Sequence, residues 1–559
     1  MRKKIKIVFG VFVLVLLVLV AIYFFNVHMS SPLAGGQEID HVKVENLGDD
    51  HYATIDGSWI HKNDKEIWEI YLRGDPYERG LAFGALAQQL LAEKESSFIT
   101  EIENRVPSSS YLNFLKYVVG WFHRDLDEYV PEEYLKEIYG SSQYMADSFD
   151  YISPKYHRGL SYHAAHDIGH ALQNMNLVGC TSFAVRGEKS ENGKLLIGRN
   201  FDFYFGEEFA KDRMVAFYNP DDGYQFMSVT WACFSGVVSG MNEMGLTVTL
   251  NSAKSGIPSM GKTPVSIIAR QILQYAGTID EAYDIARSYE SFVAETFLIG
   301  SKQDGRAALI EKTPEATALY EENDSEMIIT NHFQSNELQD DPLNQEYLQE
   351  GVSDYRYERV GQLIDSLAPL NPEKVALVLR DKRGVDGEDI GLANEKAINQ
   401  LIAHHSVIFS PEQMIAWVSA PPYQLGDFIA YDLNKIFKET KKKQFTYTDS
   451  LSIGKDAFLF TDRYKRYIDF VEIRGKIQKH LAKGGEFVLH NEDVNRFIES
   501  NPHGFLTYFY LGDYFKSIES WQEAEKYYNI ALDLEIAKKS ERKHIEEGLK
   551  ICRKHLNIQ

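Results

Sequence analysis

The sequence predicts a protein of mixed α and β class. Residues 78 to 174 carry apolar side chains at helical spacing, whereas residues 180 to 252 are short β-prone runs separated by turn signals. Helical periodicity returns over 264–290, and strand-like runs return over 295–330. With 559 residues the chain is too long for one ordinary core, so we expect two to four units.

The overall composition indicates a globular protein that does not bind nucleic acid. Apolar residues make up 44% and charged residues 25% of the chain, as in folded proteins. The formal net charge is -22, whereas a protein that binds nucleic acid needs clustered positive charge. We expect no nucleic-acid partner and no cofactor.

The first 26 residues predict a membrane anchor. Ile7 to Phe25 form an apolar stretch without charge that is long enough to cross a bilayer, and basic residues precede it. That charge pattern predicts a single-pass membrane protein whose body lies outside the cytoplasm. A cleaved signal peptide is the alternative; the length of the stretch favours the anchor, and in both cases the body is exported.

Residues 27–179 predict a polar tether followed by a helical segment. The part between 27 and 60 contains Gly35-Gly36 and few periodic signals. From Glu78 onward the apolar residues recur near helical spacing. These residues are Leu81, Phe83, Leu86, Leu90 and Leu91.

The strongest indication of a catalytic residue is a cysteine that directly follows a glycine. Cys180 and the pair Arg199 and Asp202 lie on two β-prone runs joined by an Asn-Gly turn over 191–194. A hairpin returns the pair to the cysteine, and a guanidinium beside a thiol lowers the thiol pKa, which makes a nucleophile. The bond from Gly179 is open to attack by this thiol, because glycine tolerates strained geometry. Cleavage leaves a cysteine whose free α-amine serves as its base.

The other two cysteines indicate no chemistry. Three cysteines form no disulfide framework. Cys233 lies in a strand-like run and is expected to be a buried apolar residue, whereas Cys552 lies in a charged terminal helix.

Taken with further motifs in the same order, the chain resembles the N-terminal-nucleophile hydrolases of the isopenicillin-N acyltransferase type, relatives of choloylglycine hydrolases and penicillin V acylases. The resemblance covers roughly residues 65 to 435. Besides Cys180 and Gly198-Arg199-Asn200-Phe201-Asp202, it rests on the segment 71–80, Gly-Met-Asn-Glu-Met-Gly-Leu at 240–246, Asn251, Thr-Asn-His-Phe at 330–333, and Arg356.

The resemblance implies a fold and a reaction. It implies an αββα sandwich over residues 180–450, preceded by a prosegment that ends at Gly179. It also implies that Cys180 attacks an acyl amide or thioester, that Asp202 holds the α-amine and that Arg199 favours the thiolate. In the same way it implies that Asn251 stabilises the oxyanion, an effect worth about 3–4 kcal/mol, and that Asn331 and Arg356 complete the polar shell. Arg359, one helical turn later, is the rival of Arg356.

Two other functions remain open. A papain-like amidase would use a separate histidine base and would not need cleavage at Gly179. A non-enzymatic scaffold would keep its function when Cys180 is replaced by alanine.

Histidines at 163, 166 and 170 share one helical face and could bind zinc. No His-Glu-x-x-His motif is present, so packing or assistance to cleavage is favoured and no metal is expected. His404-His405 is interpreted as a helix end.

Residues 451–559 predict a helical tail with one tetratricopeptide-like repeat near 505–538. A solitary repeat cannot bury its face alone, so we expect it to pack on residues 180–450, called the catalytic body, with protein binding as the alternative. The fitting positions are Tyr508, Leu511, Gly512, Phe515, Ala524, Tyr528 and Ala531.

Overall fold

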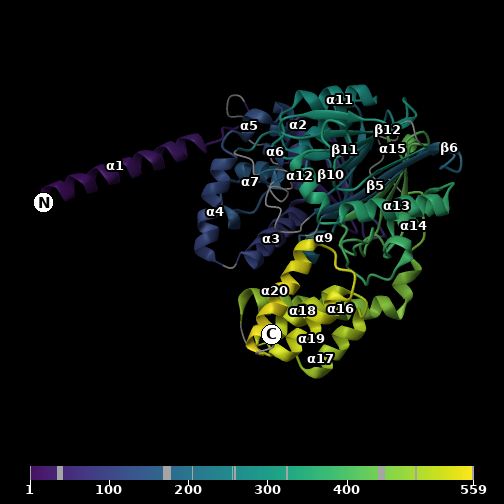
Figure 1. Ribbon diagram of the computed structural model, residues 1–559. Helices are drawn as coiled ribbons and strands as arrows, with labels where there is room; N and C mark the ends of the chain where they lie inside the picture. The colour runs from purple at the N-terminus through teal and green to yellow at the C-terminus, as the bar shows by residue number, and fades with distance from the viewer. Residues whose placement is uncertain are drawn as a thin grey trace.

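Two facing β-sheets form the centre of the molecule, and helices cover both outer faces (Figure 1). The computed structural model describes residues 2–33, 42–106, 108–165, 167, 178–203, 205–254, 256, 260–322, 325–438, 447–484 and 487–556. This arrangement is the αββα sandwich that the resemblance implied.

The larger sheet contains eleven of the described strands, and all neighbours are antiparallel except β4 and β7, which are parallel. In spatial order the strands are β1 (Val44–Gly48), β2 (His51–Thr54), β3 (Trp59–Lys62), β4 (Trp68–Gly74), β7 (Met214–Pro220), β8 (Phe226–Thr230), β9 (Ser239–Asn242), β10 (Leu246–Ser252), β11 (Glu295–Ser301), β12 (Arg306–Lys312) and β13 (Thr317–Tyr320).

The smaller sheet contains six of the described strands and carries the candidate nucleophile. In spatial order they are β14 (Glu326–Ile329), β5 (Val178–Gly187), β6 (Gly193–Phe203), β15 (His405–Ser410), β16 (Ile415–Ser419) and β17 (Phe428–Asp432).

Apolar side chains from both sheets fill the space between them. Ala184 and Ile197 of the smaller sheet pack in one cluster with Phe217, Met241 and Leu298 of the larger sheet. The alternation along each strand separates this inner face from the outer one, because successive side chains of a strand point to opposite sides.

Helices of the catalytic body cover both outer faces. The larger sheet is covered by α10 (Val265–Tyr275) and α11 (Ile279–Ser288), and the smaller one by α13 (Ser353–Leu367) and α14 (Pro372–Leu379). Shorter helices complete this part: α9 (Glu207–Ala210), α12 (Pro342–Leu348) and α15 (Leu433–Ile436).

The segment before Cys180 is helical as expected, but it also adds strands to the sheet. A polar tether was expected over residues 27–60, but residues 44–62 form β1 to β3, and β4 follows. β4 pairs with β7 of the catalytic body along its whole length, so the two parts share one sheet. The helices are α2 (Pro76–Leu86), α3 (Gln88–Arg105), α4 (Ser109–Phe122), α5 (Leu126–Tyr129), α6 (Glu132–Ser142) and α7 (Lys155–His163).

The chain begins with α1 (Arg2–Asn26), which projects from the body in Figure 1. A transmembrane anchor was expected at Ile7 to Phe25. Within the part of the chain that the structure describes, no helix combines the length and the apolar character needed to span a bilayer, so the expected anchor is unsupported.

The tail is helical and packs on the body. α18 and α19 form the expected hairpin, in which Gly512 allows the ring of Tyr528 to approach closely. Its assignment as a tetratricopeptide repeat stays a prediction. The tail helices are α16 (Asp462–Lys483), α17 (Asn491–Ser500), α18 (Phe505–Ser517), α19 (Trp521–Leu532) and α20 (Lys539–His555).

Candidate active site

The predicted hairpin around Cys180 is confirmed. In the antiparallel pair β5 and β6, Cys180 lies opposite Phe201, Ser182 opposite Arg199, and Gly179 opposite Asp202. Cys180 and Arg199 therefore point to the inner face, between the sheets, and Asp202 points to the other face.

Two side chains from distant segments hold the backbone of Cys180. Its N–H donates to Asn331 Oδ1 at 3.1 Å, and its carbonyl oxygen accepts from Arg356 Nη1 at 2.5 Å. Arg356 Nη2 also donates to Asn331 Oδ1, at 2.7 Å. Asn331 is fixed in turn by donating to the Ser252 carbonyl at 2.8 Å. The structure thus brings Asn331 and Arg356 directly to Cys180.

Arg356 is the arginine at the site, and its rival Arg359 is not. Arg359 forms an ion pair with Asp381, in which Nε lies 2.9 Å from Oδ2. The Arg359 guanidinium therefore contacts Asp381 instead of Cys180.

Arg199 lies beside the thiol. Its Nη2 is 3.7 Å from Cys180 Sγ and also donates to the Leu250 carbonyl, and its guanidinium stacks on Phe201 at 4.3 Å. The side chain of Arg199 is completely buried.

The expectation of a lowered thiol pKa is wrong for the uncut chain. Burial raises the pKa of Cys180 to about 11, although Arg199 and Arg356 act to lower it. The charges of Asp202 and Glu295 add to the increase. The sequence showed the arginine but not the loss of solvent around the thiol, and here the loss of solvent is the larger effect.

Asp202 is a buried carboxylate with neither oxygen hydrogen-bonded to any residue that the structure describes. Burial raises its pKa to about 7, against the opposing effect of Arg356 and Arg199. A carboxylate without partners inside a protein is costly, so this position calls for a cation or a proton donor.

The hydrogen bonds that Asn251 makes among the described residues go to residues other than Cys180. Its Nδ2 donates to the Thr330 carbonyl at 2.9 Å, and its Oδ1 accepts from Ser182 Oγ at 2.7 Å. Asn251 lies on β10 of the larger sheet and Ser182 on β5 of the smaller one, so the amide bridges the two sheets beside the site.

Of the three histidines considered as metal ligands, His163 lies within the described residues. His163 Nδ1 lies 2.7 Å from the Gly159 carbonyl and its Nε2 accepts from the Ser235 N–H at 2.9 Å, so both ring nitrogens are engaged. His166 and His170 lie outside the described residues. Over the described ranges, no group of three or more His, Cys, Asp or Glu side chains is placed to hold a metal ion.

Sequence reasoning missed several residues around the site. His404-His405 is not a helix end, because His405 begins β15. The β-prone run Ser406 to Phe409 that follows could have indicated this. Gln400 was not singled out, yet a Cβ at Gly179 would lie only 3.1 Å from its Nε2. Gly179 does not have a positive φ, so the close approach of Gln400, not a left-handed backbone, favours glycine here.

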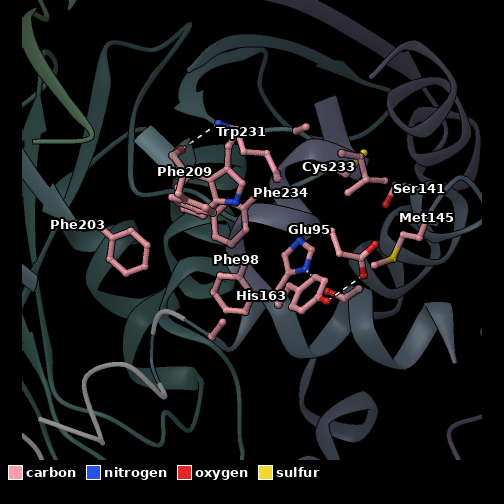
Figure 2. A pocket seen from close by; sticks show the side chains of 16 residues that line it. Glu95, Phe98, Ser141, Met145, His163, Phe203, Phe209, Trp231, Cys233 and Phe234 are labelled. Carbon is pink, nitrogen blue, oxygen red and sulfur yellow. Dashed lines mark hydrogen bonds between the residues drawn. The ribbon is translucent and has the colours of Figure 1, made fainter. Parts of the chain in front are cut away.

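A cavity of about 60 Å³ lies between the helical segment before Cys180 and the catalytic body. Figure 2 shows the rings of Phe209, Trp231 and Phe234 gathered in its wall, with His163 nearby. Phe203 also lines it and stacks on Phe201, the cross-strand partner of Cys180, at 5.6 Å between ring centroids. The cavity therefore lies on the same face of the hairpin as the thiol.

The charged side chains in the cavity wall are engaged elsewhere. Glu95 forms an ion pair with Arg158 at 2.8 Å, and Lys94 Nζ donates to the Phe209 carbonyl at 2.9 Å. The remaining wall is mostly apolar and aromatic, which suits an apolar group.

Residues 188–421 match the family model described as acyl-coenzyme A:6-aminopenicillanic acid acyl-transferase. The match confirms the resemblance and contains Arg199, Asp202, Asn251, Asn331 and Arg356, while Cys180 lies eight residues before its start. This supports an amidohydrolase or acyltransferase of the N-terminal-nucleophile type.

Curated relatives match more distantly. An uncharacterised protein of Archaeoglobus fulgidus is 24% identical over 55% of this chain and 56% of its own length. The proteins dcd1B and dcd1A of Dictyostelium discoideum are 21% and 24% identical over 48% and 46% of this chain, and over 55% and 61% of their own lengths. The chain thus spans little more than half the length of these relatives.

Two solved structures align over less than half of this chain. One is the Caenorhabditis elegans ortholog of N-acylethanolamine-hydrolyzing acid amidase, at 19% identity and a TM-score of 0.30 over 42% of this chain and 93% of that one. The other is a mutant of the conjugated bile acid hydrolase of Clostridium perfringens, at 14% identity and a TM-score of 0.31 over 48% of this chain and 96% of that one.

Proposed function

We propose that this chain is a self-cleaving cysteine amidohydrolase or acyltransferase that acts on an acyl amide or thioester through Cys180. The observation that carries the proposal is the arrangement around this one residue. Asn331 and Arg356 hold its backbone, Arg199 contacts its thiol, and the buried Asp202 faces the adjoining glycine without a partner among the described residues.

Activation begins at the bond between Gly179 and Cys180. The thiol attacks the Gly179 carbonyl carbon, the peptide C–N bond breaks, and the acyl group moves from nitrogen to sulfur as a thioester. Water then hydrolyses the thioester, which leaves a carboxylate on Gly179 and a free α-amine and thiol on Cys180.

The new α-ammonium gives Asp202 the cation that it lacks in the uncut chain. Asn331 Oδ1, which accepts from the Cys180 N–H at 3.1 Å, is already placed to accept from the amine. In its neutral form the amine takes the thiol proton and becomes the ammonium, the thiolate attacks the acyl carbon of the substrate, and the ammonium gives its proton to the leaving amine. Water or an amine releases the acyl group from sulfur.

We infer that the cavity beside Phe203 binds the acyl group of the substrate and that this acyl group is apolar. Its wall combines Phe209, Trp231 and Phe234 with Leu91 and Met145. An aromatic or a short aliphatic acyl group fits this lining better than a charged one does.

The proposal is tested by intact-mass analysis together with an acyl-amide panel. The wild-type protein should split into fragments that begin at Met1 and Cys180, and only the split protein should release amine from aromatic and aliphatic acyl amides. The Cys180→Ala variant should stay intact and inactive. Activity of a wild-type protein that remains in one piece would refute the self-cleaving mechanism and favour a papain-like one.

A further inference from the structure

A chain of hydrogen-bonded, buried side chains extends from Arg199, beside the thiol, through Ser239 and His405 to His404. The mechanism above does not use the last three of these residues. Arg199 Nη1 donates to Ser239 Oγ at 2.5 Å, on the side of the guanidinium away from Cys180. Ser239 Oγ lies 2.9 Å from His405 Nε2, and His405 Nδ1 lies 3.0 Å from His404 Nδ1. All four side chains are completely buried.

The chemistry of arginine fixes the direction of the first bond in this chain. A guanidinium only donates, so Ser239 Oγ accepts from Arg199 and its own hydrogen is free to go to His405 Nε2. When that hydrogen is donated to Nε2, His405 carries its proton on Nδ1 and donates to His404 Nδ1, and His404 carries its proton on Nε2.

Both histidines are neutral in this environment. Burial lowers the pKa of His404 and of His405 well below the usual value, and nearby cations act in the same direction. For His404 these cations are Arg213, Lys94 and Arg199. A neutral His405 has one nitrogen that accepts, and the serine hydroxyl uses it.

We propose that Ser239 and His405 are positioning residues that hold the Arg199 guanidinium against the Cys180 thiol. Arg199 has two firm anchors besides the thiol, the Leu250 carbonyl at Nη2 and Ser239 Oγ at Nη1. The carbonyl fixes one nitrogen, and the hydroxyl fixes the rotation of the planar group, because two bonds on different nitrogens define its plane.

The far end of the chain reaches the wall of the cavity. The ring of His404 lies 5.4 Å from Trp231 and 6.1 Å from Phe209, and both aromatic residues line the cavity. His405 in turn packs on Phe201, the cross-strand partner of Cys180, at 5.2 Å. The same chain therefore connects the acyl-binding wall with the group beside the nucleophile.

The expected effect on turnover rests on the proposed function. The expected effect on the pKa of the Cys180 thiol does not, and it can be measured in a protein without activity. The test uses the full chain with Cys233→Ala and Cys552→Ala, so that Cys180 is the one thiol present. The pH dependence of its alkylation by iodoacetamide reports the thiol pKa, and kcat and KM are measured with the best amide of the panel.

Removal of either positioning residue should alter the thiol and kcat but not KM. In Ser239→Ala and in His405→Phe we expect the thiol pKa to rise by about one unit, because the nearby cation is no longer held in place. We expect kcat to fall about tenfold or more with KM little changed. Ser239→Thr and His405→Gln keep the hydroxyl and the acceptor, and should restore most of both quantities.

Ser410→Ala is the matched control. Ser410 lies on β15 like His405, is completely buried and donates to Gln413 Oε1 at 2.8 Å, but it does not belong to the chain. Ser410→Ala should lower the melting temperature about as much as Ser239→Ala and His405→Phe do. It should leave the thiol pKa and kcat unchanged. The inference is overturned if Ser239→Ala and His405→Phe behave like Ser410→Ala. A protein with the shifted thiol pKa but no activity on any amide would count against the proposed function and not against this inference.

Discussion

Gly179 lies directly opposite Asp202 in the pairing of β5 with β6, and the Asp202 carboxylate is fully buried and without a hydrogen-bond partner among the described residues. The uncut chain therefore keeps an unsatisfied acid beside the bond that the proposed self-cleavage would break. The reaction would supply the missing partner, since it creates an ammonium group on the next residue. Asp202 thus favours the cleaved form over the precursor.

The first prediction concerns the pH dependence of precursor stability, measured in the uncleavable Cys180→Ala variant. Burial raises the pKa of Asp202 from 3.8 to about 7 in the fold. Between these values the unfolded chain is ionised while the folded chain stays protonated, so stability should fall as pH rises. The slope is about 1.4 kcal/mol per pH unit for this one group, which gives a total on the order of 4 kcal/mol.

Urea unfolding at a series of pH values measures this effect. The double variant Cys180→Ala, Asp202→Asn should lose the decline that Asp202 causes, and its advantage over the single variant should grow from pH 4 to pH 7. Equal stability of the two proteins at pH 8 would show that the buried carboxylate carries no such cost.

The second prediction is that the fragments stay together after cleavage. Strand β4 belongs to the first fragment and pairs in parallel with β7 of the second, from Trp68 opposite Met214 to Gly74 opposite Pro220. Denaturing gels should show pieces of about 20 and 44 kDa, from the residue count. Native size-exclusion chromatography should show one species near the 64.0 kDa of the whole chain. Separate elution without denaturant would contradict the shared sheet.

The third prediction concerns a buried ion cluster at the same interface. Glu137 on α6 lies 3.0 Å from Arg79 and 3.3 Å from Arg270 on α10 of the catalytic body. Burial opposes ionisation, yet Arg270 and Arg79 keep the pKa of Glu137 below its usual value. Glu137→Ala leaves two buried cations without this partner and should destabilise the protein by about 3–5 kcal/mol.

Glu132→Ala is the control for the third prediction. Glu132 lies on the same helix and pairs with Lys136, but it is 72% exposed. Its loss should leave the unfolding free energy nearly unchanged, because an exposed ion pair contributes little to stability. Thermal or denaturant unfolding measures the stability of both variants. Similar losses of stability would show that the buried cluster contributes no more than an exposed ion pair does.

The sequence predicted the local geometry of the site better than its environment. The Asn-Gly turn and two β-prone runs were enough to place Arg199 and Asp202 near Cys180, because a hairpin is determined by neighbouring residues. The thiol pKa could not be obtained in this way, since burial depends on the rest of the chain. Strand β1 was missed because it is fully exposed and carries no apolar alternation.

The same limit applies to single site residues. Arg356 and Arg359 are equivalent in sequence, and only the packing of α13 directs the first to Cys180 and the second to Asp381. His405 was missed because its partner Ser239 is 166 residues away in the chain.

The fourth prediction concerns the acyl group. Trp231 and Phe234 stack at 4.2 Å in the cavity wall, and neither belongs to the polar site. Phe234→Ala should enlarge the cavity and shift the preference of kcat/KM toward acyl groups longer by several carbons, by roughly tenfold. Leu86→Ala, in the same core but not in the cavity wall, should lower stability without changing the preference. An unchanged chain-length profile in Phe234→Ala would place the acyl group elsewhere.

The last prediction gives the tail a role in cleavage. The segment from 390 to 401 carries Gln400, which lies against Gly179, and the tail holds this segment at several points. Asn501 donates to and accepts from the backbone of Leu392, and Lys396 forms an ion pair with Glu535 at 2.5 Å. The tail should therefore fix the residues that pack on the scissile bond.

Charge reversal tests this role without removing the tail. Glu535→Lys places two cations together and should slow the appearance of the two fragments by about tenfold, because the segment beside Gly179 loses its fixed position. The exchange Lys396→Glu with Glu535→Lys rebuilds the pair and should restore the rate. Glu525→Lys, which breaks the pair with Arg553 inside the tail, should leave the rate unchanged. If Glu535→Lys is processed at the wild-type rate, or if the exchange fails to restore it, the tail acts on stability alone.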